Sequence, residues 1–330
     1  MNGRRAVKVA AWAPMIGLWA AVALVAGHAG SNDQASALDG FLRGPVDLAG
    51  PRLAQTRYYR FESQVVQIGF DGRRTGIQTY VLKLKCVPAS LAGKPGDEYT
   101  CRSLTLQADS EKPAAIPALA GWTYVFKDSP TGADEAGQVL GIPHAKFEGL
   151  VDDQGRKIAP AVSYLIYNNF IDFHSFNDIL SRPTPEGKGV QDLTRIGQRI
   201  VHSAAFTSPA VNLGTNIKPG SFFKNGEITM ELKGLGLVDG SPCALVGYDS
   251  GESTLKMIVS MSPKVDIVTE GGSEYAGDFW IDLSSCWMRR MALNEFVVTR
   301  TSLPGGGKMD SYIVRHLTIR LISAEEYGMD

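Results

Sequence analysis

Alternating apolar and polar positions run through most of this chain and predict a protein built mainly of antiparallel strands. In TGIQTYVLKLKC the apolar side chains follow a period of about two residues, and the Asp71-Gly72 pair ahead of it is a hairpin signal. Near the C-terminus, Ile313, Leu317 and Ile319 face one way while His316 faces the other. A sheet with one buried face is therefore expected at both ends of the chain.

The pattern predicts strands in two groups. Six strand-like runs fall in the first group: Tyr58–Phe70, Gly76–Cys86, Cys101–Asp109, Trp122–Lys127, Phe147–Val151 and Lys157–Tyr167. The second group has seven strands between about Gly226 and Ile322, separated by DG, DSG, EGG and PGGG turns. Since no long helix signal interrupts this second group, its strands are expected to pair with their neighbours as a meander.

Helical spacing occurs only in the middle of the chain. Phe173, Phe176, Ile179 and Leu180 predict a helix that ends before Pro183, and an apolar stripe predicts a second helix over Val190–His202. The expected fold class is α+β, with two antiparallel sheets or one large curved sheet. This half-barrel-like meander would carry two helices inserted mid-chain.

The first thirty residues have the order of a secretory signal peptide. Arg4, Arg5 and Lys8 precede the apolar run Met15–Gly27, and small residues follow it. An uncleaved anchor over Val9–Gly27 is the alternative, although the compact apolar part is shorter than the roughly 20 residues of a spanning helix. The expected location is periplasmic or secreted. The expected organisation is a signal at 1–30, a tether at 31–55, a β half at 56–167, a helical insert at 168–205 and a β half at 206–330.

Composition narrows the classes of partner. Without residues 1–30 the chain keeps 30 basic and 34 acidic residues, with no long run of either charge. This weakly acidic balance disfavours nucleic-acid binding and a polybasic membrane patch. The sequence contains no GxSxG, HExxH or SxxK motif and no glycine loop that leads into a helix, so no catalytic residue, metal site or cofactor is predicted.

Four cysteines fit an exported protein, because disulfides persist outside the cytosol. Four cysteines allow three pairings. The favoured pairing joins Cys86 to Cys101 and Cys243 to Cys286, each within one half of the chain.

The segment Gly234–Ile322, and above all its GDFWIDL and MRRMALNEF strands, resembles the half-open antiparallel barrels of periplasmic lipoprotein carriers and related lipid-binding envelope proteins. The resemblance is one of pattern and covers at most a third of the chain. It implies a concave sheet face that holds acyl chains beneath short helices.

Three charged residues on strands are candidate ligand contacts. Arg289 and Glu295 alternate with Trp287, Met291 and Leu293, and Arg315 interrupts the apolar face of the last strand. If the strands are neighbours, Glu295 could pair with an arginine across the sheet. An arginine in an apolar concavity could instead hold a carboxylate or phosphate head group.

Aromatic and helical residues supply further candidates. Trp122, Phe279 and Trp287 could line a ligand cavity or form ordinary core. In YNNFIDFHSFNDIL, His174 and Asp178 share a helical face and suggest an acid–base pair or two metal ligands. The alternative is that the two side chains only make a contact at the protein surface. His144 and Glu148 are too far apart for one metal if their segment is a strand.

These features favour an exported, non-catalytic binding protein whose ligand is a lipid or another apolar molecule. One alternative is an interaction or structural module with a filled core that contacts another envelope protein. The other is an extracytoplasmic hydrolase with a polar cleft around His174 or Glu295.

Overall fold

The computed structural model describes residues 40–41, 44–49, 54–69, 71–91, 94–126, 142–177, 188–208, 218–262 and 265–329. The predicted signal peptide at 1–30 lies outside these residues. Of the predicted tether, 31–55, only short pieces are described.

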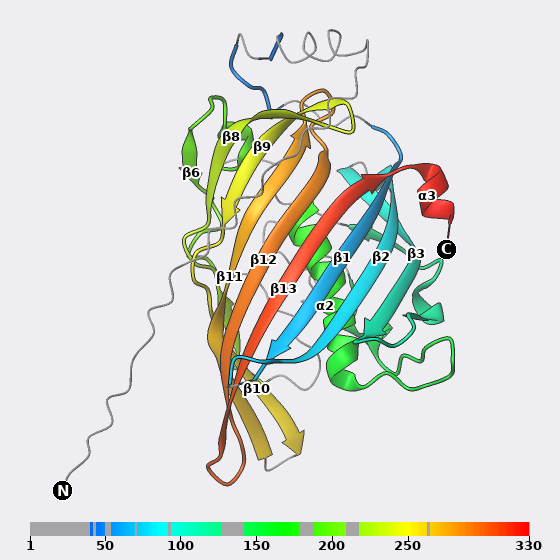
Figure 1. Cartoon of the computed structure of the whole chain (residues 1–330), viewed down its shortest axis with the longest axis vertical. Helices are drawn as coiled ribbons and strands as arrows, with labels where there is room; N and C mark the ends of the chain where they lie inside the picture. The colour runs from blue at the N-terminus through cyan, green and yellow to red at the C-terminus, as the bar shows by residue number, and fades with distance from the viewer. Residues whose placement is uncertain are drawn as a thin grey trace, which may run out of the picture.

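In the part of the chain that the structure describes, a single antiparallel sheet of 13 strands organises the fold (Figure 1). Its order is β4-β3-β2-β1-β13-β12-β11-β9-β8-β6, with β5 paired to β3, and β10 paired to both β11 and β7. The pairing of β1 with β13 joins the first and last of these described strands, so one sheet runs through both predicted β halves. The strand bounds are β1 Arg57–Ile68, β2 Arg74–Leu91, β3 Lys94–Ala108, β4 Ala114–Ala115, β5 Thr123–Phe126, β6 Arg199–Val201, β7 Phe222–Lys224, β8 Thr229–Val238, β9 Ser241–Asp249, β10 Thr254–Ser262, β11 Val265–Asp282, β12 Met288–Ser302 and β13 Lys308–Ile322.

The sequence prediction of a β-rich α+β fold is confirmed, and the β1–β2 hairpin forms at Asp71-Gly72 as expected. The second β group contains fewer strands than predicted because β11 continues through the EGG segment expected to turn. At Gly271 a Cβ would lie 2.1 Å from the carbonyl oxygen of Val298, and at Gly272 it would lie 2.3 Å from that of Ser253. These glycines therefore allow close approach of neighbouring backbones rather than a turn.

Helical structure also differs from the prediction. The principal helix, α2, spans Pro160–Asn177, so the predicted strand at 157–167 is mostly helix. The run VSYLIY is apolar without a clear period and fits either state, whereas Pro160 suits the first turn of a helix.

The predicted second helix at 190–202 is wrong. This segment has a 3-10 turn at Val190–Asp192 (η4) and the edge strand β6. Gly197 between them adopts φ +80, which a regular helix does not allow. A short helix, α3, spans Ala324–Gly328 at the end of the chain.

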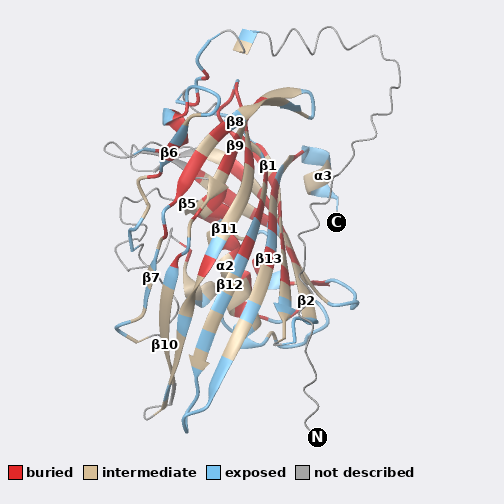
Figure 2. Cartoon of the chain, turned by 60° about the vertical axis from the view of Figure 1, so that its left-hand side comes forward, coloured by how far each residue is buried: buried red, intermediate tan, exposed pale blue. Residues whose placement is uncertain are grey.

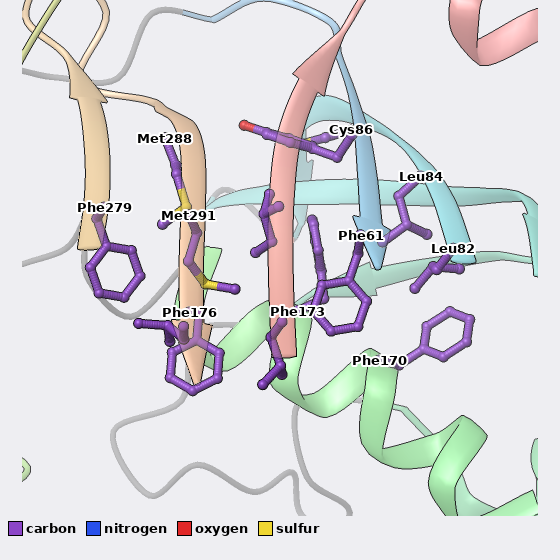
Figure 3. Close-up of a cluster of buried hydrophobic side chains, with 14 of the residues drawn as sticks. Phe61, Leu82, Leu84, Cys86, Phe170, Phe173, Phe176, Phe279, Met288 and Met291 are labelled. Carbon is purple, nitrogen blue, oxygen red and sulfur yellow. The ribbon is translucent and has the colours of Figure 1, made fainter. Parts of the chain in front are cut away.

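The core lies between the concave face of the sheet and α2, which crosses behind β13, β1 and β2 in Figure 1. Rings from α2 pack on this face: Phe173 contacts Tyr59 and Phe61, and Phe176 contacts Phe279 (Figure 3). One row of directly opposed residues crosses five strands and is almost fully buried: Leu82, Phe61, Ile319, Met291 and Phe279. Burial of this apolar face stabilises the folded state.

We expect Gly271→Ala to destabilise the protein by about 1–3 kcal/mol, because the added Cβ forces the β11 and β12 backbones apart. Urea unfolding measures the change. Gly236→Ala is the matched control, since a Cβ at Gly236 in β8 meets nothing within 4 Å. Equal stability of the two variants would contradict this account of β11.

Candidate functional site

The predicted cross-strand ion pair of Glu295 exists, and its partner is Arg315. The two residues are directly opposed on β12 and β13, and Arg315 Nη1 donates to Glu295 Oε2 at 2.6 Å. Both are buried, with 7% of Arg315 and 4% of Glu295 exposed. The sequence pattern therefore located this pair correctly, whereas the ligand-binding role of either residue stays a prediction.

A second carboxylate, Asp172, reaches the same arginine from α2. Its Oδ2 accepts a hydrogen bond from Arg315 Nη2. The hydroxyl of Tyr275 on β11 lies 3.4 Å from Arg315 Nη1. We call Asp172, Tyr275, Glu295 and Arg315 the buried charge cluster. Sequence reasoning placed Asp172 among polar helix residues but missed this contact, because the crossing of α2 over β13 has no local signal.

The cluster holds one guanidinium between two carboxyl groups. Burial raises the pKa of Asp172, Arg315 opposes this shift, and Glu295 adds to it. Burial alone would lower the pKa of Arg315, but Asp172 and Glu295 raise it well above its usual value. Burial also raises the pKa of Tyr275. The guanidinium is thus permanently charged and already neutralised, which leaves no net positive charge for an anionic ligand.

Arg289 does not join this cluster, contrary to the face assigned from its alternation with Glu295. A register shift between Trp280 and Ile281, where β11 pairs β12, breaks that alternation. Arg289 Nε donates to Asp282 Oδ2 at 2.8 Å, and the amides of Ser284 and Ser285 donate to Asp282 Oδ1. Although burial raises the pKa of Asp282, hydrogen bonds from Arg289 and Ser285 lower it overall. Arg289 therefore stabilises the turn between β11 and β12.

The three aromatic candidates lie in separate parts of the core. Trp122 stacks on Tyr124 and contacts Phe147 and Phe170. The ring of Phe279 contacts Phe176 and Tyr248. The ring of Trp287 packs under Arg57, whose Cζ is 4.6 Å from the ring centroid. Each ring packs against other side chains, so the three rings do not line one common ligand cavity.

His174 is buried inside the core and not at the surface. Its Nε2 is 2.8 Å from the hydroxyl of Tyr124, and its ring contacts Tyr99 and Phe173 edge-on. The predicted partner Asp178 lies outside the described residues. His144 Nδ1 and Glu148 Oε1 do meet, at 3.4 Å, because the 3-10 helix His144–Phe147 (η2) replaces the strand assumed for them.

The cysteines do not form either predicted disulfide in the structure. Cys86 lies opposite Tyr99 and Cys101 opposite Leu84, so the two are diagonal on neighbouring strands. Diagonal positions are about 7–8 Å apart, whereas a disulfide needs a Cα separation of about 4.4–6.8 Å. Burial raises the pKa of the Cys101 and Cys243 thiols to about 12. Across the described ranges, no group of three or more His, Cys, Asp or Glu side chains is arranged to hold a metal ion.

The outer face of the sheet, away from α2, carries an exposed apolar surface. Phe296 and Val298 on β12 are 56% and 53% exposed, and Tyr312 on β13 is 36% exposed. Figure 2 shows the alternation of exposed and less exposed positions along these strands. Strand pairing makes the surface continuous: Phe296 is opposite Val314, which is opposite Val66, and Val298 is opposite Tyr312, which is opposite Ile68. We call these six residues the outer patch.

Comparison with known proteins adds little. No known family model matches the chain, and no curated protein sequence is similar to it. One structural likeness, from work on the asymmetric conductivity of engineered proteins, has a TM-score of 0.22 and 7% identity over 81% of this chain and 100% of the other. An outer membrane channel from Pseudomonas putida F1 has a TM-score of 0.16 and 8% identity over 83% of this chain and 97% of the channel. Scores this low establish neither a fold nor a function.

Within the described part of the chain, no helix is both long enough and apolar enough to cross a membrane.

We expect Arg315→Met to destabilise the protein by about 3–5 kcal/mol, because Glu295 and Asp172 would remain buried without their cation. Urea unfolding at pH 7 measures the loss. Arg300→Met is the control, since the Arg300–Asp310 pair on the same two strands is exposed, and a loss of about 0–1 kcal/mol is expected there. Similar losses in the two variants would show that the buried charge cluster has no special role in stability.

Asp172→Asn should remove a pH dependence of stability. A carboxyl whose pKa is raised by folding binds protons more tightly in the folded state, so its ionisation lowers stability as pH rises above its unfolded pKa. The variant should therefore equal or exceed the parent protein in free energy of unfolding at pH 8, and the difference should shrink toward pH 4. Asp153→Asn, at an exposed turn, is the control. A variant that is less stable at pH 8 would show that attraction to Arg315 outweighs burial.

Proposed function

We propose that this chain is an exported, non-catalytic binding protein that docks a protein partner through the outer patch. The single observation that supports this proposal is the continuity of six apolar side chains over β1, β13 and β12, with Phe296 and Val298 more than half exposed. Contiguous exposed apolar surfaces on soluble proteins commonly mark interaction sites. Export rests on the N-terminal signal pattern of the sequence.

The border of the outer patch favours a protein over a lipid surface. The Arg300–Asp310 ion pair lies at one end, and His316, whose Nδ1 is 2.6 Å from Asn294 Oδ1, lies at the other. An apolar centre with a mixed polar rim is the usual anatomy of a protein interface. A site for an anionic membrane would instead carry a rim of lysine and arginine.

The packing of the core also favours the docking of a protein partner over the carriage of a lipid. Phe173 and Phe176 of α2 already pack on the aromatic side chains of the concave face. An acyl chain on that part of the sheet would first have to displace α2. A hydrolase is less favoured still, because Glu295 and Asp172 are both paired with Arg315.

A photoreactive residue at Val298 should form a discrete adduct with one other protein in cells that produce the full chain. A second substitution, Phe296→Asp, should reduce that adduct at least tenfold while it changes the free energy of unfolding by no more than about 0.5 kcal/mol, as is usual for exposed positions. The control photoreactive residue is at Ser302, which is exposed on the same face of β12 beyond the patch.

The proposal is wrong if the adduct forms equally from both positions, or if Val298 labels only lipid. An adduct with twice the mass of the chain would show that the partner is a second copy of this chain and not a different protein.

A further inference from the structure

One edge of the sheet is open along part of β8, which lies between β6 and β9 (Figure 1). β9 pairs with β8 over its whole length, but β6 pairs with it only at Thr229–Glu231. The backbones of Gly197 and Gln198 extend this cover as far as Leu232. In the part of the chain that the structure describes, nothing pairs with Lys233–Val238 on the side away from β9, so this run is a strand edge.

The backbone groups of Leu235 and Leu237 point away from β9. A two-residue turn with positive φ at both positions joins β8 to β9, and Val238 and Ser241 are the opposed pair that flanks it. In such a hairpin the flanking pair exchanges hydrogen bonds, and bonding then alternates from one pair to the next. Gly236 therefore bonds to β9, whereas the N–H and C=O groups of Leu235 and Leu237 face outward along the edge.

This edge is complementary to a second copy of itself. Antiparallel pairing about a two-fold axis at Gly236 sets Leu235 opposite Leu237 of the other copy, where the two residues can exchange hydrogen bonds through their outward groups. Gly236 then faces Gly236 of the other copy in a non-bonded pair, in which the Cα atoms are about 4.5 Å apart. A Cβ at Gly236 would meet nothing within 4 Å, so nothing obstructs the strand at this point.

The side chains of the run suit the same pairing. Leu237 is 37% exposed and Leu235 packs at the margin of the core, so the two leucines would cover each other across the axis. The run Gly234–Val238 carries no charge, whereas Lys233, already paired with a carboxylate of β11, precedes it and Asp239 follows it. Antiparallel pairing brings the lysine end of one copy beside the aspartate end of the other. Strand edges that avoid pairing usually carry a charge or a proline within such a run.

We infer that β8 pairs with β8 of a second copy of this chain, so that two sheets join into one across a two-fold axis at Gly236. This dimer goes beyond docking at the outer patch, which lies on other strands. A pairing this short buries less than the roughly 1,600 Å² of a standard interface, so the dimer is expected to be weak and to depend on concentration.

Cysteine crosslinking of the purified full chain tests the register. Gly236→Cys should form a covalent dimer in oxidised glutathione, because Cα atoms about 4.5 Å apart suit a disulfide. Gly234→Cys is the matched control, since a Cβ there also meets nothing within 4 Å, but its two copies would lie about 13 Å apart along the strands. Both variants carry Cys243→Ala, because Cys243 is opposite Gly236 within the hairpin and would compete for the new thiol. We expect about tenfold more dimer from position 236.

Light scattering at rising protein concentration tests the dimer without a crosslink. Leu237→Lys should raise the dissociation constant at least tenfold, because it places an ammonium group against Leu235 of the other copy. Val298→Lys, in the outer patch, is the control and should leave self-association unchanged. Both positions are exposed, so both variants should melt at the parent temperature.

Equal crosslinking from positions 234 and 236 would overturn the two-fold register. Loss of self-association in Val298→Lys but not in Leu237→Lys would place the contact at the outer patch and overturn the inference. A monomer in both assays would overturn it as well and would leave a strand of a different protein as the occupant of this edge. The crosslink from Val298 to a different protein is independent of these results.

Discussion

The salt bridges of Arg315 to Glu295 and Asp172 constrain this structure more than any other interaction. Removing three charged groups from water is expensive unless each finds its partner. Two of them lie on neighbouring strands and the third on α2, so their pairing requires that β12, β13 and α2 occupy one relative position. The apolar contacts of Phe173 and Phe176 would tolerate small shifts of the helix along the sheet, whereas the hydrogen bonds of the guanidinium, which depend on distance and angle, do not.

Local patterning was sufficient to predict the sheet, because a period of two residues is visible in any strand with one buried face. It predicted the β1–β2 hairpin, most strands of the second group and the Glu295–Arg315 pair. It failed where the pattern is ambiguous or interrupted. The VSYLIY run has no clear period, and the Gly271-Gly272 pair is a turn signal that the structure uses for close strand contact.

Long-range features could not be predicted from the sequence. The pairing of β1 with β13 joins residues that are far apart in the chain, and no local sequence pattern indicates it. The approach of Asp172 to Arg315 depends on how α2 crosses the sheet, which follows from packing of rings contributed by many elements. Arg289 shows a related failure: Trp280 pairs with Arg290 and Ile281 with Met288, so the extra residue Arg289 leaves the alternation that Met291, Leu293 and Glu295 follow.

The register of β12 and β13 links the two faces of the protein. Glu295 and Phe296 are adjacent, one buried beneath α2 and the other exposed in the outer patch. A slip of one residue would bring Phe296 toward the core and expose Glu295. Such a slip would leave Arg315 and Asp172 without Glu295 and would also remove Phe296 from the outer patch. The buried charge cluster therefore specifies the geometry of the outer surface, although none of its members reaches that surface.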